Sequence, residues 1–154
     1  EMQTLGFNYR LTDIQAALGI EQLKKLNTFV SRRREICKKY NDAFRDAPQI
    51  LLPAELSGCR HSYHLFVIRL QGKLVSKRRA IFEELQKRGI GVQVHYIPIP
   101  AQPYYRQLGY RSADCPNAQT YYRAAISLPV FPKMSDGEVA RVVKTVKDVV
   151  CFYS

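Results

Sequence analysis

The sequence predicts an α+β fold in which a small sheet of about three strands is covered by helices. Long stretches with helical spacing of apolar residues open and close the chain, and three short apolar runs rich in β-branched residues lie between them. Proline and glycine separate these runs from one another. With so few strands, a small sheet with helices on one face is the expected form.

The size and composition suit one compact unit. The chain has 154 residues and is 46% hydrophobic, which is enough to bury a sizeable core. No run is long enough to span a bilayer and no signal segment leads the chain, so we expect a cytoplasmic protein without a membrane partner. The chain opens with Glu1-Met2-Gln3 instead of an initiator methionine, and we therefore expect it to be a piece of a longer protein.

The net charge of +11, from 24 Lys and Arg against 13 Asp and Glu, favours anionic partners such as nucleic acid, an anionic membrane or phosphorylated small molecules. The alternative is a solvated basic surface. The predicted strands carry almost no basic residue, which weighs against a nucleic-acid-binding sheet. Much of the surplus lies on the outward positions of one helix, at Arg32, Arg33, Arg34, Lys38 and Lys39.

Two helices are predicted at the start of the chain. Thr12 can cap the first, with Gln15 completing the capping box. Weak helix formers at residues 27–31 predict a kink or break before the second. The apolar positions of the two helices are Ile14, Ala17, Leu18, Leu23 and Leu26, then Val30, Ile36, Cys37, Tyr40 and Phe44.

The middle of the chain alternates between loop, strand and helix. Residues 48–60 read as a loop, and residues 62–70 as an interior strand that is apolar on both faces. Ser76 can cap a helix whose apolar positions are Ile81, Phe82 and Leu85. Gly89 suits the left-handed residue that follows this helix.

The second half begins with a strand at residues 90–96, followed by a proline-rich loop. Short helices are expected near residues 104–108 and 117–123, and a short strand at residues 125–130. Ser135 and Glu138 form a capping box for the final amphipathic helix. Its apolar stripe consists of Val139, Val142, Val143, Val146, Val149 and Val150.

His95 is the histidine with the most informative position. Strand alternation places it with Gly91 and Gln93, away from the apolar face, at the end of a strand and before a loop. A neutral imidazole there can donate to a phosphate or sugar oxygen, or transfer a proton. The alternative is an ordinary surface histidine.

Other candidate sites are weaker. His61 and His64 lie near Cys59, but strand alternation sends the two histidines to opposite faces, and no metal site is predicted. The four cysteines are scattered and read as buried or unreactive thiols of a reducing cytoplasm. The tyrosine pairs 104–105 and 121–122 can stack on a base, or simply pack in core and rim positions.

The stretch GFNYRLT at residues 6–12 places Asn8 and Arg10 just before a helix start. Asn8 offers an amide donor and Arg10 a guanidinium, with the free backbone amides of the helix close behind. Such an arrangement can bind a phosphate. An ordinary connecting loop is the alternative, because both residue types are common in loops.

Four motifs in order give a more specific indication: GFNYRLTDIQAALGIEQL, HSYHLFVIRL, KRGIGVQVHYIPIPAQPYY and ISLPVFPKMSDGEV. Together they resemble the DegT-type sugar-nucleotide aminotransferases, which are pyridoxal-phosphate (PLP) enzymes of the aspartate-aminotransferase fold (type I PLP fold). The similarity runs through residues 6–149. GIGVQVHYIPI and QPYYRQLGY are most similar to the members that act in pseudaminic acid biosynthesis.

This resemblance implies that the chain is the C-terminal part of such an enzyme. Residues 1–46 would form an interface segment with the long helices, and residues 47–154 the small sheet-and-helix domain. The large domain with the Schiff-base lysine would lie upstream. No catalytic residue is therefore assigned in this chain, and the isolated piece is not expected to transaminate.

The resemblance also assigns roles to four residues. Asn8 would cross a homodimer interface and bind the cofactor phosphate of the partner subunit, with Arg10 close by towards the substrate. His95 and Tyr96 would line the nucleotide-sugar pocket. Many relatives have a histidine where this chain has Pro100-Ala101, which leaves the exact sugar open.

The implied reaction moves an amino group from glutamate to carbon four of a UDP-linked 4-keto-6-deoxy N-acetyl hexose, with PLP as cofactor. One alternative is a transaminase of another nucleotide-linked keto sugar. A different class is a basic module that binds nucleic acid, which we disfavour because the basic residues lie on helices. Neither nucleic acid nor membrane is an expected partner.

Overall fold

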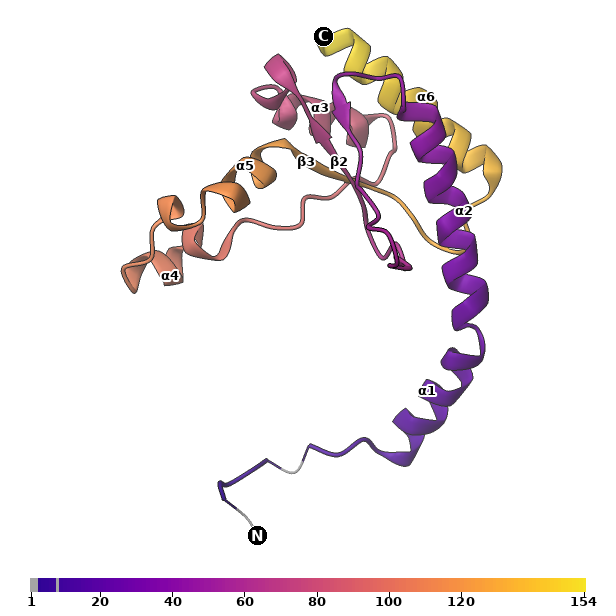
Figure 1. Ribbon diagram of the computed structural model, residues 1–154, viewed down its shortest axis with the longest axis vertical. Coiled ribbons are helices and arrows are strands. Elements are labelled where there is room, and N and C mark those ends of the chain that lie inside the picture. The colour runs from indigo at the N-terminus through magenta and orange to yellow at the C-terminus, as the bar shows by residue number, and fades with distance from the viewer. Residues whose placement is uncertain (1–2, 8) are drawn as a thin grey trace.

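The computed structural model describes residues 3–7 and 9–154. The chain forms a body around a three-stranded sheet, and helix α1 extends away from this body with the N-terminal segment beyond it (Figure 1). The prediction of an α+β fold with a small, helix-covered sheet is confirmed.

Two helices, α1 (Asp13–Lys24) and α2 (Leu26–Phe44), follow one another at the start of the chain. The Thr12 capping box is present, as predicted. The break falls at Lys25 and not at residues 27–31, where the sequence predicts it. Asn27 and Thr28 instead occupy the first turn of α2, where residues that compete for backbone hydrogen bonds cost less than in a helix interior.

The apolar stripe of α1 is exposed. None of its residues is buried, and Ile14, Leu18 and Leu23 all present most of their surface to solvent. The second helix differs, because Ile36 and Tyr40 lie fully in the core of residues 47–154. The division at residue 46 stays a prediction, although the end of α2 shares its core with the sheet domain.

The sheet is antiparallel with the order β1-β2-β3, formed by β1 (Ile50–Leu51), β2 (Phe66–Leu70) and β3 (Ala125–Leu128). In its register Ile50 lies opposite Leu70, and Ile68 lies opposite Ile126.

The strands differ from the prediction at three points. Strand β1 lies within the predicted loop 48–60, and the predicted strand 90–96 contributes only an isolated bridge between Gln93 and Ser127. A tight turn, in which the Val92 amide donates to the Ile90 carbonyl at 2.9 Å, interrupts the extended chain there. The strand predicted at 62–70 starts at Phe66, because Tyr63 has a positive φ of 47°.

Short helices fill the region between β2 and β3. They are η1 (Gly72–Val75), α3 (Arg78–Lys87), η2 (Ile99–Ala101), α4 (Pro103–Gln107), η3 (Ser112–Asp114) and α5 (Pro116–Ala124). The predicted Ser76 cap is wrong: Lys77 is the N-cap of α3, and the Ser76 hydroxyl donates to the Lys73 carbonyl of the preceding turn at 2.8 Å. Gly89 has the left-handed φ of 77° that the sequence predicts.

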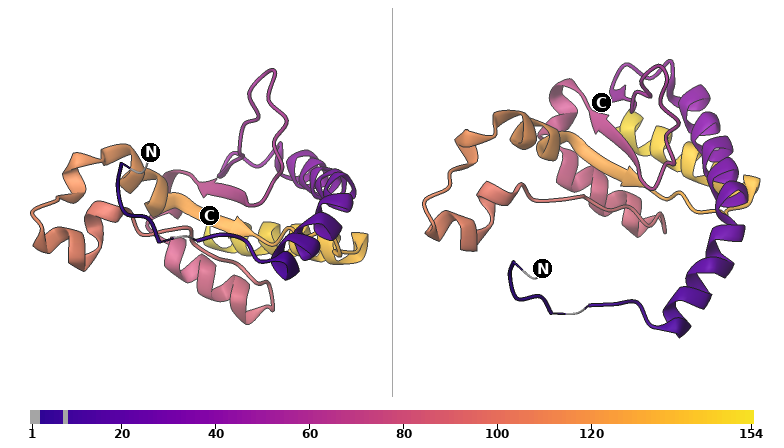
Figure 2. Two further views of the ribbon diagram at one scale, coloured as in Figure 1. Left: turned by 90° about the horizontal axis from the view of Figure 1, so that it is seen from below. Right: turned by 60° about the horizontal axis from the view of Figure 1, so that its bottom comes forward.

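The final helix α6 (Asp136–Tyr153) begins with the predicted Ser135 capping box. Helices α3 and α6 lie on one face of the sheet, and α2 packs beside α6 (Figure 2). Five valines of α6 are buried in the core: Val139, Val142, Val146, Val149 and Val150.

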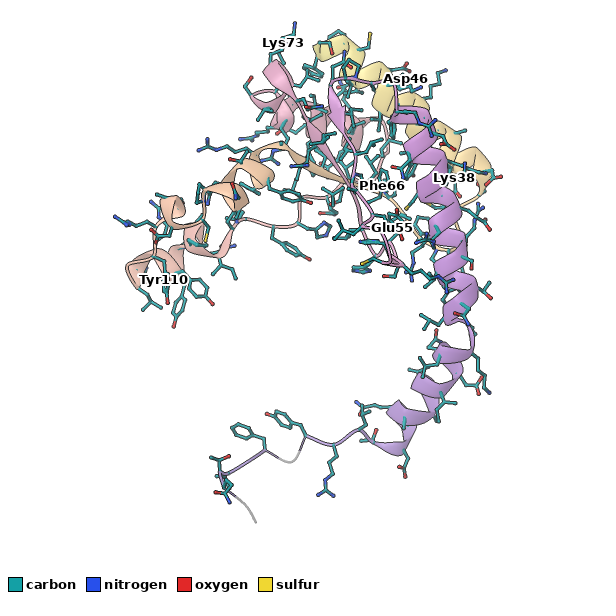
Figure 3. The ribbon with its side chains drawn as sticks, in the orientation of Figure 1. Lys38, Asp46, Glu55, Phe66, Lys73 and Tyr110 are labelled. Atoms are coloured by element: carbon teal, nitrogen blue, oxygen red, sulfur yellow. The ribbon has the colours of Figure 1, made fainter. Side chains whose placement is uncertain are left out.

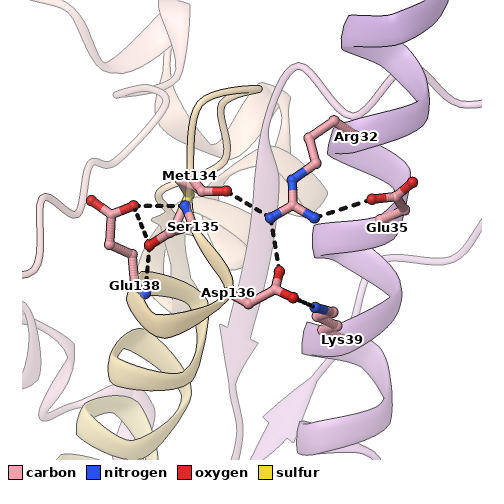
Figure 4. A network of polar contacts seen from close by, with 7 residues as sticks. All are labelled: Arg32, Glu35, Lys39, Met134, Ser135, Asp136 and Glu138. Atoms are coloured by element: carbon pink, nitrogen blue, oxygen red, sulfur yellow. Dashed lines mark hydrogen bonds and ion pairs between the residues drawn. The ribbon is translucent and has the colours of Figure 1, made fainter.

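A polar network joins the start of α6 to α2 (Figure 4). Arg32 donates to the Met134 carbonyl at 2.7 Å and to the Asp136 carboxylate at 2.8 Å, and Lys39 lies 2.6 Å from the other Asp136 oxygen. These cations, Lys39 first and Arg32 second, lower the pKa of Asp136 to about 2. The network fixes the position of α6 relative to α2 at the point where the chain leaves the sheet.

In the part of the chain that the structure describes, no helix combines the length and apolar character needed to cross a membrane.

Candidate functional site

His95 lies beside the sheet, where the chain leaves its bridge to β3. Its Nδ1 is 2.9 Å from the hydroxyl oxygen of Ser127, and its ring is half-buried. Gln93, two residues earlier, exchanges both backbone hydrogen bonds with Ser127, at 3.1 and 2.8 Å. The bridge therefore sets the position of the backbone from which the imidazole extends.

Ser127 is a site residue that the sequence analysis did not single out. It is the third of four residues in a short apolar strand, and it is only 4% exposed. A polar residue inside an otherwise apolar run was the available signal, because a buried hydroxyl requires a hydrogen-bond partner.

Tyr96 extends from the same place into solvent, with 75% of its surface exposed. Its ring meets the His95 ring edge-on, with a centroid separation of 4.7 Å. The chain then continues into a lobe that contains α4 and carries exposed aromatic rings; Tyr110 lies in this lobe (Figure 3). Tyr105 contacts Tyr104 and Tyr110 edge-on, with centroid separations of 5.4 and 5.9 Å.

Arg10 lies in the segment before α1 and is exposed. Among residues 3–7 and 9–154 it forms no ion pair or side-chain hydrogen bond, so its guanidinium is available to an anion. Asn8 lies outside the described residues.

The helix start behind Arg10 differs from the expectation of free backbone amides. The Thr12 amide donates to the Gln15 side chain at 3.0 Å, and the Gln15 amide donates to the Thr12 hydroxyl at 3.3 Å. Asp13 adds a negative charge to the first turn. The amides of Thr12 and Gln15 are therefore already paired and are not available to an anion at this end.

The structure does not bring the two predicted parts of the site together within one chain. The segment before α1 lies apart from the loop that follows His95, as Figure 1 and the right view of Figure 2 show. The described part of this segment is unusually apolar for an exposed chain. Leu5, Phe7, Tyr9 and Leu11 are between 77% and 91% exposed.

The other histidines do not form a metal site. In residues 3–7 and 9–154 no group of three or more His, Cys, Asp or Glu side chains could hold a metal ion. The His61 Nδ1 instead accepts a hydrogen bond of 2.8 Å from the Tyr63 amide. Tyr121 and Tyr122 face arginines, with Arg69 and Arg78 at 5.8 and 5.1 Å from their ring centroids.

A family comparison agrees with these features. The model of the DegT/DnrJ/EryC1/StrS aminotransferase family matches residues 1–147. The chain belongs to this family. The resemblance inferred from the four sequence motifs is thereby confirmed.

Individual relatives give more detail. The spore coat polysaccharide biosynthesis protein SpsC of Bacillus subtilis is 39% identical over 153 residues, which cover 97% of this chain and 39% of SpsC. The UDP-4-amino-4,6-dideoxy-N-acetyl-beta-L-altrosamine transaminase of Helicobacter pylori is 36% identical over 146 residues, which cover 95% of this chain and 39% of the relative. The chain thus spans about two fifths of the length of these relatives.

Solved structures of the family share the fold. Helicobacter pylori PseC, an aminotransferase involved in the biosynthesis of pseudoaminic acid, superimposes with a TM-score of 0.87 at 35% identity over 97% of this chain and 40% of PseC. The PLP form of Spr1654 from Streptococcus pneumoniae, assigned as a sugar aminotransferase, has a TM-score of 0.87 at 33% identity over 94% of this chain and 37% of Spr1654. The predicted similarity to part of an aminotransferase of the type I fold is therefore confirmed.

Proposed function

We propose that this chain is the C-terminal part of a PLP-dependent aminotransferase that moves an amino group from glutamate to carbon four of a UDP-linked 4-keto-6-deoxy N-acetyl hexose, as in pseudaminic acid biosynthesis. The observation that carries the proposal is the similarity, in sequence and in fold, to the Helicobacter pylori transaminase of this kind. The altrosamine transaminase is 36% identical over 95% of this chain, and PseC shares its fold with a TM-score of 0.87.

A second candidate is a transaminase of a different nucleotide-linked keto sugar. SpsC, a spore coat polysaccharide biosynthesis protein, is 39% identical to this chain, which supports that reading to a similar degree. We propose no nucleic-acid partner, because several of the basic residues already pair with acids on the chain's own surface. Arg32, Arg34, Lys38 and Lys39 are among them.

The residues present fit phosphate-bearing ligands. The Arg10 guanidinium is exposed and forms no ion pair within the described residues, so it can offer two parallel donors to an anionic oxygen. We propose that Asn8 faces the cofactor phosphate and that Arg10 faces the substrate. When bound, PLP supplies the electron sink that lets the amino group move.

On the substrate side, His95 and Tyr96 would line the nucleotide-sugar pocket. The His95 ring is held on one side by Ser127 and meets Tyr96 on another, so its remaining polar atom, Nε2, can bind an oxygen of the ligand. The exposed Tyr96 ring offers an apolar face to a sugar and helps to exclude water.

The segment before α1 would complete the site of a partner subunit in a homodimer. Extended chain with large apolar side chains at 77% to 91% exposure is more typical of an interface than of free surface. Because this segment lies apart from the loop that follows His95 within the chain (Figure 1), contact with a second subunit would give Arg10 a site to act in.

The deciding experiment compares nucleotide keto sugars as amino acceptors for the full-length protein, with glutamate as donor. We expect the UDP-linked 4-keto-6-deoxy N-acetyl hexose to exceed the others in kcat/KM by about tenfold or more, which corresponds to about 1.4 kcal/mol of transition-state binding. A preference for another sugar would favour the second candidate. Absence of transfer to every nucleotide sugar would contradict both.

A further inference from the structure

The hydrogen bond between Ser127 and His95 indicates which nitrogen of the His95 ring carries the proton. Ser127 is 4% exposed, and the four residues of its strand, β3, are all buried. Both of its backbone groups are paired with Gln93. The hydroxyl oxygen is thus held at a fixed, largely buried place 2.9 Å from the Nδ1 of His95.

The hydroxyl proton of Ser127 has one available acceptor among the described residues. Within residues 3–7 and 9–154, the Ser127 hydroxyl has a single hydrogen-bond partner, the His95 Nδ1 at 2.9 Å. If Nδ1 carried the ring proton, it would donate to the hydroxyl oxygen and the buried hydroxyl proton would be left without an acceptor. Leaving a buried donor unpaired is costly, whereas donation from the hydroxyl to Nδ1 satisfies both groups.

We propose that Ser127 is a positioning residue that holds His95 in the neutral tautomer with its proton on Nε2. The edge-on contact with Tyr96, at a centroid separation of 4.7 Å, limits rotation of the ring from the other side. Nε2 has no partner within the described residues, so its N–H is free to donate to a ligand.

This assignment deepens the proposed function and rests on it for the identity of the ligand. A histidine fixed in this tautomer recognises an oxygen acceptor, such as a hydroxyl, carbonyl or phosphate oxygen of the nucleotide sugar. It is a donor in the binding step and does not accept a proton at Nε2. His95 then contributes to affinity for the sugar and not to the exchange with glutamate.

The tautomer of His95 can be measured without an activity assay. In full-length protein labelled with nitrogen-15 at histidine, two-bond proton–nitrogen correlations distinguish a protonated from a bare ring nitrogen, and a His95→Gln variant assigns the signals. We expect Nε2 protonated and Nδ1 bare in the wild type. A protonated Nδ1 in the neutral ring would overturn the proposal.

The variant Ser127→Ala removes only the hydroxyl, and we expect the His95 signals to move to averaged positions as the two tautomers exchange. Signals unchanged from wild type would overturn the proposal. The matched control is Ser76→Ala, which also removes a hydroxyl with a 2.8 Å hydrogen bond but on a surface turn, and which should leave the His95 signals in place. If Ser127→Ala fails to fold, the tautomer measured in the wild-type protein still decides whether the proposal holds.

Kinetics separate this proposal from the proposed function. For Ser127→Ala we expect the KM for the nucleotide sugar to rise about twofold to tenfold, the effect of one net hydrogen bond, with the glutamate half-reaction unchanged. A fall in kcat at constant KM would contradict the donor role. If the tautomer is fixed as expected but no nucleotide sugar is aminated, the positioning by Ser127 stands and the proposed function fails.

Discussion

The guanidinium of Arg34 holds the carboxylate of Glu55 by two hydrogen bonds, Nη1 to Oε1 at 2.6 Å and Nη2 to Oε2 at 3.2 Å. The same carboxylate accepts the His61 amide at 2.7 Å and the Tyr63 hydroxyl at 3.2 Å. Arg34 also donates to the His61 carbonyl at 2.8 Å. Glu55 therefore ties the loop between β1 and β2 to helix α2 (Figure 3).

This carboxylate predicts a pH dependence of stability. Arg34 first, and the His61 amide second, lower the pKa of Glu55 from 4.5 to about 2. The unfolded chain binds about one more proton than the folded chain between these two values, so the stabilisation is present above pH 4.5 and is lost as the pH falls towards about 2. In denaturant titrations we expect Glu55→Gln to show a shallower acid loss than wild type. A control variant, Glu21→Gln, should keep the wild-type slope, and equal slopes for all three proteins would refute the expectation.

Tyr40 gives a prediction for the core. Its hydroxyl donates to the Pro129 carbonyl at 2.9 Å from a fully buried position. Tyr40→Phe leaves that carbonyl unpaired, and we expect it to lower the free energy of unfolding by about 1 to 3 kcal/mol. Urea unfolding measures the change. Tyr104→Phe, on an exposed ring, is the control and should have almost no effect, and a loss for Tyr40→Phe no larger than the control's would show that the hydrogen bond adds nothing.

The cysteines should differ sharply in reactivity. Burial raises the pKa of the Cys37 thiol to about 12, while Cys59, Cys115 and Cys151 are exposed. Since the thiolate is the reactive form, we expect iodoacetamide at neutral pH to modify the three exposed cysteines and to reach Cys37 only after unfolding. Mass spectrometry of the modified peptides checks this. Early modification of Cys37 in the folded chain would mean that helix α2 opens readily.

Much of the helical structure could be predicted from the sequence because its signals are local. The capping boxes at Thr12 and Ser135 and the left-handed Gly89 depend on residues within one helical turn, and all three are confirmed. The valine stripe of α6 is likewise a short-range pattern.

What the sequence could not reveal depends on distant partners. Residues 90–96 alternate like a strand, but the turn at Val92 leaves them a single bridge, whereas β1 forms because Ile50 and Leu51 meet the end of β2. Ser127 and His95 are 32 positions apart in the sequence, and no local sequence pattern predicts their hydrogen bond. The Thr12 capping box is predicted correctly. The backbone amides behind Arg10 are nevertheless expected to be free, whereas the box pairs those of Thr12 and Gln15.

The role of His95 can be tested by measuring the two half-reactions separately. If it contacts only the nucleotide sugar, His95→Ala in the full-length protein should raise the KM for that sugar about tenfold and leave the glutamate half-reaction nearly intact. Single-turnover kinetics of the two halves measure this. His64→Ala, on an exposed histidine, is the matched control. Equal damage to both half-reactions would remove His95 from the sugar pocket.

The role of the segment before α1 is tested through cofactor retention. If Asn8 faces the phosphate of PLP in a partner subunit, Asn8→Ala should weaken PLP binding about tenfold without unfolding the protein, because one donor to an anionic oxygen is lost. Arg10→Ala should mainly weaken binding of the nucleotide sugar, since Arg10 is placed towards the substrate. Equilibrium dialysis with PLP and circular dichroism report affinity and fold separately. Unchanged PLP affinity in Asn8→Ala would remove its role. If the site is shared between subunits, a mixed dimer of one Asn8→Ala and one His95→Ala subunit should regain one site with wild-type affinity for PLP and for the nucleotide sugar.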